Sequence, residues 1–125
     1  MLTLQPPSEE WVTSYFEFIA EMRRHGEKIW EGIIPKYNES TLQFVQRLLR
    51  AESHPAPGLV AETTYWACEG RTVVGRIALR HYLNEELKKF GGHIGYEVRP
   101  SYRKRGIAKE MLRQTLRTPK AKEIR

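Results

Sequence analysis

Apolar residues recur at three- and four-residue intervals in two stretches of the first half of the chain, which predicts two amphipathic helices. In the first stretch Ser8 stands before two glutamates, as at a helix N-terminus, and the helix is expected to end near Gly26. Its apolar stripe consists of Trp11, Tyr15, Phe18, Ile19 and Met22. The second helix is predicted to begin at Ser40 or Thr41, and Phe44 fits its stripe less well. That stripe consists of Leu42, Val45, Leu48 and Leu49.

Alternation with a period of two appears further along the chain and predicts β-structure. The expected strands are residues 2–4, 63–69, 72–82 and 95–100. Gly70-Arg71 forms the turn of a hairpin, and residues 85–90 are expected to form a short helix. After Gly106 the helical period returns, and Pro119 is expected to stop that helix. Its apolar positions are Ile107, Ala108, Met111, Leu112 and Leu116. The order of elements predicts a mixed α/β fold.

The composition is that of a globular protein and not of a disordered chain. With 125 residues, 40% of them hydrophobic and 29% charged, the chain is expected to form one domain, residues 1–125. No apolar run is long enough to cross a membrane, and the N-terminus lacks the features of a signal peptide. A single cysteine, Cys68, fits a reducing compartment, so we expect the protein to be cytoplasmic.

The positive charge is concentrated at the end of the sequence. The formal net charge is +6, and residues 99–125 hold ten Lys or Arg against Glu110 and Glu123, a local balance of +8. A basic segment of this kind favours an anionic ligand. Nucleic acid is one candidate, but few aromatic side chains suitable for base stacking accompany these charges, so this interpretation is the least supported.

A turn that suits a phosphate lies at the start of the last predicted helix. Backbone N–H groups of a helix's first turn have no intrahelical partner, and the macrodipole adds partial positive charge there. Gly106 allows a ligand to approach the backbone closely, and Arg103, Lys104 and Arg105 surround it with positive charge. The three glycines of a dinucleotide-binding turn and the Gly-Lys-Ser/Thr of a P-loop are both missing.

The pattern Arg103-x-x-Gly106-x-Ala108, placed after the strand-like segment Gly-Tyr-Glu-Val-Arg-Pro, resembles the coenzyme A signature of the Gcn5-related N-acetyltransferase (GNAT) family. The resemblance implies the acyl-CoA N-acyltransferase fold, a mostly antiparallel sheet flanked by helices. It also implies acetyl coenzyme A as the acetyl donor, an amine as the acceptor and no metal. The cofactor-binding residues that it implies are Val98, Arg99, Arg103, Lys104, Arg105, Gly106, Ile107 and Ala108.

The resemblance further implies that Glu97, in the strand before the turn, is the general base. A protonated amine must lose a proton before it attacks a thioester, and a carboxylate is able to accept that proton. A backbone N–H near Val98 is expected to stabilise the negative charge that develops on the thioester oxygen. His93 is the competing base, but it lies about 13 Å away along an extended strand. Alternatively, Glu97 is a structural carboxylate that pairs with Arg99 or Arg76.

Residues 27–39 keep no regular period but include large apolar side chains. In the GNAT family the segment between the first two helices commonly lines the acceptor site, so Trp30 and Tyr37 are predicted to bind the substrate. The alternative is that both side chains cover the edge of the core. The four histidines are scattered and match no metal-ligand spacing.

The sequence departs from the family pattern after the last predicted helix. Residues 118–125 have too few apolar positions for the fifth strand, the helix and the closing hairpin that the family places there, and the family's tyrosine general acid has no counterpart. The fourth strand is therefore expected to keep an open edge, which favours a homodimer. A truncated, non-catalytic fragment that binds acetyl coenzyme A or serves in assembly is the alternative function.

Overall fold

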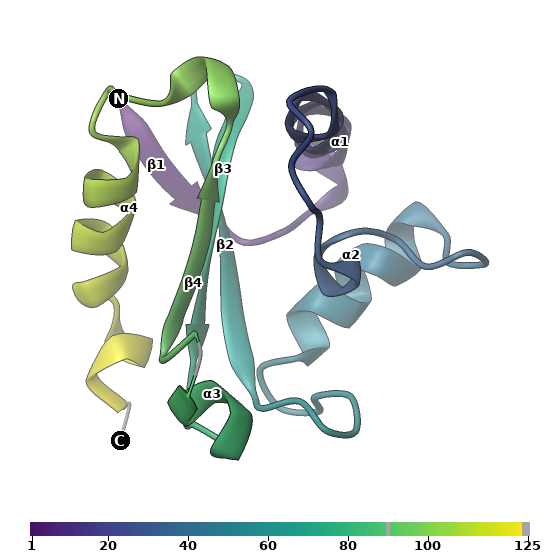
Figure 1. Ribbon diagram of the computed structural model, residues 1–125, viewed down its shortest axis with the longest axis vertical. Helices are drawn as coiled ribbons and strands as arrows, with labels where there is room; N and C mark the ends of the chain where they lie inside the picture. Colours follow the sequence, from purple (N-terminus) through teal and green to yellow (C-terminus); the bar gives the residue numbers. More distant parts are fainter. Residues whose placement is uncertain (90, 124–125) are drawn as a thin grey trace.

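The computed structural model describes residues 1–89 and 91–123. Its centre is a four-stranded antiparallel sheet in the order β1-β2-β3-β4 (Figure 1). The strands are β1 (Leu2–Gln5), β2 (Glu62–Glu69), β3 (Thr72–Arg80) and β4 (Ile94–Val98). Helices α1 (Glu9–Arg24) and α2 (Thr41–Arg50) lie on one face of the sheet, and α4 (Ile107–Leu116) lies on the other. The predicted mixed α/β class with a mostly antiparallel sheet is therefore confirmed.

Shorter elements connect these parts. They are the 3₁₀ helices η1 (Glu31–Ile33), η2 (Pro100–Tyr102) and η3 (Pro119–Glu123) and the helix α3 (Glu85–Lys89). The end of the short helix predicted for 85–90 falls on Phe90, which lies outside the described residues. The strand predicted for 95–100 stops at Val98, because Pro100 begins η2. Among the described residues, no helix is long and apolar enough to span a membrane.

The main core lies between the sheet and the α1–α2 layer. Tyr15 of α1 stacks on Trp66 of β2 with 4.2 Å between ring centroids and 10° between ring planes. Phe44 of α2 is fully buried in the same cluster, whereas Leu42 and Leu49 are exposed. The predicted stripe of α2 was thus rotated. The spacing of apolar residues within one helix does not show which side chains contact a neighbouring helix. Here the ring centroid of Phe44 lies 6.0 Å from that of Tyr15 on α1.

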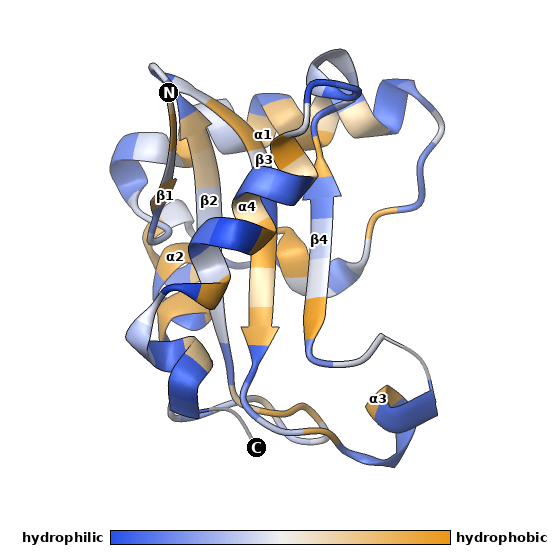
Figure 2. Cartoon of the chain, turned by 90° about the vertical axis from the view of Figure 1, so that its left-hand side faces the viewer, coloured by the Kyte–Doolittle hydropathy of each residue, from blue (hydrophilic) through white to orange (hydrophobic). Residues whose placement is uncertain are grey.

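The second core, under α4, is smaller. Ile107 and Met111 are buried against β3, and Thr115 continues the same buried row at four-residue spacing. Leu112 and Leu116, predicted for the buried face, are 40% and 55% exposed. Figure 2, which views the α4 side, shows β3 as mostly hydrophobic and the middle of β4 as polar. The two strands differ because β3 is covered on both faces while β4 is the edge strand.

The free edge of β4 presents backbone groups in a defined pattern. The Arg80 N–H donates to the His93 carbonyl (2.7 Å), and the Arg99 N–H donates to the Val74 carbonyl (2.8 Å). Antiparallel pairing alternates, so these two bonds direct the backbone N–H and C=O groups of Ile94, Tyr96 and Val98 away from β3. Within the described residues β4 pairs only with β3, so apart from the Val98 carbonyl, which accepts from Arg103, these groups form an open edge.

Candidate functional site

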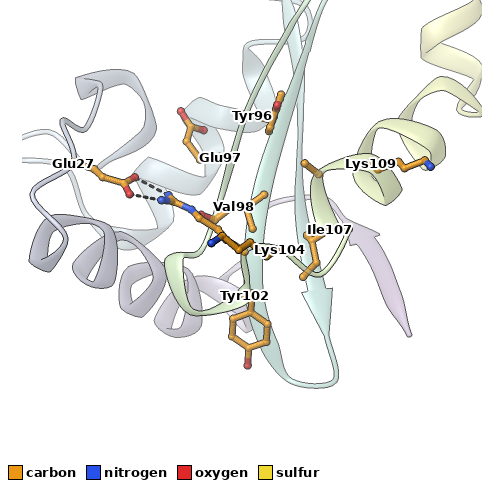
Figure 3. A pocket seen from close by; sticks show the side chains of 11 residues that line it. Glu27, Tyr96, Glu97, Val98, Tyr102, Lys104, Ile107 and Lys109 are labelled. Carbon is orange, nitrogen blue, oxygen red and sulfur yellow. Dashed lines mark hydrogen bonds and ion pairs between the residues drawn. The ribbon is translucent and has the colours of Figure 1, made fainter.

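A hollow of about 590 Å³ lies where the free edge of β4 meets the turn before α4 (Figure 3). Residues from three places in the chain line it: Glu27, which lies three residues after the end of α1, the strand β4, and the segment 102–109. The lining residues are Glu27, Tyr96, Glu97, Val98, Tyr102, Arg103, Lys104, Gly106, Ile107, Ala108 and Lys109. The hollow therefore brings together most of the residues predicted for the cofactor and the predicted base.

The turn preceding α4 has unusual backbone geometry. Lys104 and Gly106 both have left-handed conformations, with φ of 66° and 78°. Gly106 is the N-cap residue of α4 and provides no side chain to bond the first turn. Among the described residues, no acceptor is bonded to the backbone N–H groups of residues 104–109. These donors, with the dipole of α4 behind them and with Lys104 and Lys109 among the residues that line the hollow, form a concave anion site.

Arg103 reaches the border of this hollow but is already bonded within the chain. Its Nε donates to the Val98 carbonyl (2.9 Å), and its Nη2 lies 2.7 Å from Glu27 Oε1. Nη1 contacts the other carboxylate oxygen at 2.5 Å, so the ion pair is bidentate (Figure 3). This hydrogen bonding by Arg103 lowers the pKa of the Glu27 carboxyl below its usual value. The charge of Arg103 is thus largely neutralised by Glu27.

The other two arginines predicted for the cofactor point elsewhere and do not line the hollow. Arg99 lies against α1, where its Nε donates to Glu21 Oε1 (2.8 Å), and Ser101 N–H donates to the same carboxylate (2.6 Å). Arg105 lies over the ring of Tyr102, with 5.0 Å from its Cζ to the ring centroid.

Glu97 lies directly opposite Arg76 in the pairing of β4 with β3. Arg76 Nη1 donates to Glu97 Oε1 at 2.7 Å, so of the two partners considered from the sequence the structure pairs Glu97 with Arg76 and not with Arg99. The Arg76 side chain is 6% exposed and that of Glu97 is 35% exposed. Glu97 and Tyr96 leave β4 on opposite sides, and both line the hollow (Figure 3). His93, the competing base, does not line it.

Trp30 and Tyr37, predicted for the acceptor, line a second and larger hollow of about 1580 Å³ between α2, η1 and the segment that contains α3. Trp30 is 50% exposed, and Tyr37 is fully exposed. Arg47 holds the irregular loop that carries them: it donates to the carbonyls of Gly32 (3.0 Å) and Ile34 (2.8 Å) and pairs with Glu39. These bonds hold the loop in place as one side of the larger hollow. Neither aromatic residue lines the hollow at β4.

No metal centre is found in the described part of the chain, where no three His, Cys, Asp or Glu side chains gather to hold an ion. Cys68 is buried in the main core, and burial raises the pKa of its thiol to about 11. A thiol of this kind is a packing residue and not a nucleophile.

Four residues of the hollow were not predicted from the sequence: Glu27, Tyr96, Tyr102 and Lys109. Three of them lie inside or next to the strand-turn-helix segment, so extending the predicted site by one residue on each side would have included them. Glu27 gave no such signal, because it lies 76 residues before Arg103, its ion-pair partner.

Comparison with known protein families gives a match. The model of the acetyltransferase (GNAT) family matches residues 16–125, which is most of the chain and includes the whole of β4, the turn and α4. No curated protein matches the chain significantly.

Proposed function

Because the chain belongs to the acetyltransferase (GNAT) family, we propose that it transfers an acetyl group from acetyl coenzyme A to an amine. One observation carries the proposal beyond family membership: the unbonded N–H groups of the turn and the carboxylate of Glu97 open onto the same hollow. An anion site and a base are thus within reach of one ligand. Acetyl coenzyme A, when bound, supplies an activated thioester at the end of a chain that carries phosphates.

The donors of the turn fit the phosphates of coenzyme A. A pyrophosphate needs several convergent donors and positive charge, and the N–H groups of residues 104–109 with Lys104 and Lys109 supply both. Ile107 and Ala108 close the apolar side of the hollow. Arg99 and Arg105 contribute by orienting the segment, since both side chains are engaged with other groups.

Glu97 and Val98 perform the chemistry in this proposal. Glu97 Oε1 is bonded to Arg76, and no hydrogen bond within the described residues uses Oε2, so Oε2 accepts the proton that the amine loses, directly or through one water. The Val98 N–H points from the free edge of β4 and donates a hydrogen bond to the acetyl oxygen as negative charge develops there. The amine nitrogen bonds directly to the acetyl carbon, the carbon–sulfur bond of the thioester breaks, and coenzyme A leaves as a thiolate that takes a proton from solvent, so no covalent enzyme intermediate is needed.

The second hollow is the proposed acceptor site. Its aromatic residues Trp30 and Tyr37 stand on a loop that Arg47 keeps in place, so they offer a preformed surface for the part of the acceptor that does not react.

Thiol release from acetyl coenzyme A, measured with a panel of amines, tests the proposal. Glu97→Gln is expected to lower the rate by about 100-fold or more, because general-base catalysis typically contributes that much. Glu10→Gln, an exposed position on α1 distant in sequence from the hollow, is the matched control and should leave the rate unchanged. A rate that Glu97→Gln does not change would remove Glu97 as the base, and calorimetry that detects no acetyl coenzyme A binding at low salt would refute the whole proposal.

Binding without transfer is the second candidate function, and the Arg76–Glu97 ion pair favours it, because the pair gives Glu97 a structural role that needs no chemistry. It predicts acetyl coenzyme A binding with no thiol release for any amine. The free edge of β4 also supports a homodimer through strand pairing, which light scattering would detect as a doubled mass.

A further inference from the structure

The end of α1 is joined to the proposed cofactor turn by a single ion pair, Glu27–Arg103, which sequence reasoning did not anticipate. Two roles are open to an arginine in this position. It either contacts the phosphates of the cofactor or holds the turn in the conformation that contacts them. The contacts of Arg103 distinguish between the two roles.

All three donor nitrogens of Arg103 have partners in the chain. Nε is bonded to the Val98 carbonyl at the end of β4, and the two Nη atoms are bonded to both oxygens of Glu27. One guanidinium therefore links the strand, the turn and the end of α1. These bonds use three of the five N–H groups of the guanidinium and hold it in a bidentate pair, the strongest geometry for an arginine and a carboxylate, so a phosphate could reach only the second N–H of each Nη atom.

The position of Glu27 is set by the way in which α1 ends. The Gly26 N–H donates to the Arg23 carbonyl (2.9 Å), and the Glu27 N–H donates to the Met22 carbonyl (3.1 Å). Gly26 has a left-handed φ of 74°. These three features make up a Schellman motif, which fixes the backbone of the residue after the glycine. Because Met22 is buried in the main core, the carboxylate of Glu27 is anchored to the core of the protein.

A second carboxylate of the same helix supports the same segment. Glu21 of α1 accepts hydrogen bonds from Arg99 and from the backbone and side chain of Ser101. The segment between β4 and α4 is thus attached to α1 at two points, Glu21 and Glu27. Attachment at two points restricts the turn more than either bond alone would, and a restricted turn keeps its free N–H groups convergent before a ligand arrives.

We propose that Glu27 and Arg103 are positioning residues, which set the affinity of the proposed cofactor site by holding its turn and do not themselves bind the phosphates. This inference rests on the proposed function, because it assigns a role within the same site. The phosphates then meet only the backbone N–H groups of the turn and the ammonium groups of Lys104 and Lys109.

Calorimetric titration of the full chain with acetyl coenzyme A tests the proposal through four variants. Arg103→Lys keeps the positive charge but loses the three-way hydrogen bonding, so we expect it to weaken binding as much as Arg103→Met does. The expected loss is about twofold to tenfold, the usual effect of leaving one or two groups to be ordered on binding. Glu27→Ala should weaken binding by a similar factor, and the double variant with Arg103→Met should be no weaker than the single variants.

Glu27→Gln distinguishes the effect of the hydrogen bond to Arg103 from the effect of the negative charge of Glu27. It removes the negative charge as Glu27→Ala does but keeps one oxygen that accepts from Arg103, so we expect it to retain more affinity than Glu27→Ala. Glu17→Ala, which removes an exposed carboxylate from α1, is the control and should bind as the wild type does. Tighter binding by Glu27→Ala, or wild-type affinity in Arg103→Lys with weak binding in Arg103→Met, would show that Arg103 contacts the ligand and would overturn the proposal.

A second measurement does not depend on the cofactor. The Nε–H of Arg103, bonded to Val98, should give an NMR signal protected from exchange in the wild type and lost in Glu27→Ala. If the wild type bound no acetyl coenzyme A, the proposed function would fail, while a protected signal that Glu27→Ala removes would still support the holding role. An unprotected signal in the wild type would refute that role.

Discussion

Arg76 and Glu97 face each other across β3 and β4, with 2.7 Å between Nη1 and Oε1, yet only one of them is shielded from water. The guanidinium is buried, whereas the carboxylate is about one-third exposed and faces the hollow. Arg76 therefore depends on Glu97 more than Glu97 depends on Arg76. Glu97 keeps access to water when its partner is removed, but Arg76 becomes a buried charge without a counterion.

This inequality predicts that Glu97→Leu destabilises the protein more than Arg76→Met does. We expect a loss of about 1–2 kcal/mol in the free energy of unfolding for Glu97→Leu, a value reduced from that of a fully buried pair because Glu97 is partly solvated. Arg76→Met should cost less, since methionine fills much of the same space. Urea unfolding measures both, and the double variant should resemble Arg76→Met. Equal losses in the two single variants would contradict the inequality.

Replacement of Gly106 tests whether the turn needs glycine for its left-handed φ or because a side chain would not fit. A Cβ at this position would meet no atom within 4 Å, so the cost of a side chain comes from the left-handed φ of 78°. Gly106→Val should lower stability by about 1–2 kcal/mol and abolish acetyl coenzyme A binding, because a β-branched residue moves the backbone out of this region. Gly106→Asn, which tolerates left-handed φ, should retain most of the binding in calorimetry. If asparagine and valine were equally harmful, a clash with the ligand and not the backbone would be responsible.

The lowered pKa of Glu21 predicts that the folded protein is less stable in acid. Burial by itself would raise the pKa of this carboxyl, but hydrogen bonds from Arg99 and Ser101 lower it to about 2. A folded-state pKa below the unfolded value means that the stabilising contribution is complete above pH 4.5 and is lost as the pH falls from about 4.5 to about 2. The contribution is about 3 kcal/mol at neutral pH, from the size of the pKa change.

Unfolding by urea at pH 7, 4 and 3 measures this contribution. The wild type should lose stability over the range faster than Glu21→Gln does, and the difference between the two proteins should be smaller at pH 3 than at pH 7. Other carboxylates with lowered pKa, among them Glu39, remain in both proteins, so the difference isolates Glu21. Parallel curves would show that Glu21 is not the acid-sensitive group.

The contacts of Arg47 predict that its replacement weakens binding of the amine acceptor and leaves the rate of the chemical step nearly unchanged. Its guanidinium holds the carbonyls of Gly32 and Ile34, and its loss frees the loop that carries Trp30. Arg47→Met should raise the KM for the amine by about threefold to tenfold, because the loop must then be ordered on binding, and should leave kcat within about twofold. Arg24→Met, which replaces an exposed arginine of α1 that lines neither hollow, is the control and should leave both constants unchanged. A fall in kcat with an unchanged KM would contradict this prediction and show that the loop affects the chemical step.

The strand, turn and helix that build the candidate site were predictable because their signals are local. Gly106 and the basic residues beside it mark the turn, and the apolar spacing from Ile107 to Met111 marks the buried face of the helix. The alternation of a strand also placed Glu97 and Tyr96 on opposite sides. These features depend on residues that are close together in the sequence.

The partners of the charged residues were not predictable, because they depend on how distant elements pack. Arg99 and Arg103 belong to one basic cluster in the sequence, but each is paired with a carboxylate of α1 or of the residues that end it. The resemblance assigned both side chains to the cofactor, and the structure shows each of them hydrogen-bonded within the chain. Phe44 was misjudged for the same reason, since its ring packs against another helix and not along its own.

Two of the three tryptophans, Trp30 and Trp66, occupy environments different enough to serve as separate optical reporters. Trp66 is fully buried and stacked on Tyr15, so its emission should be blue-shifted, inaccessible to acrylamide, and sensitive only to loss of the core. Trp30 is half-exposed on the wall of the larger hollow and should be quenched by acrylamide until an acceptor covers it. Quenching of the unlabelled protein thus offers a direct screen of amines for occupancy of that hollow, independent of turnover.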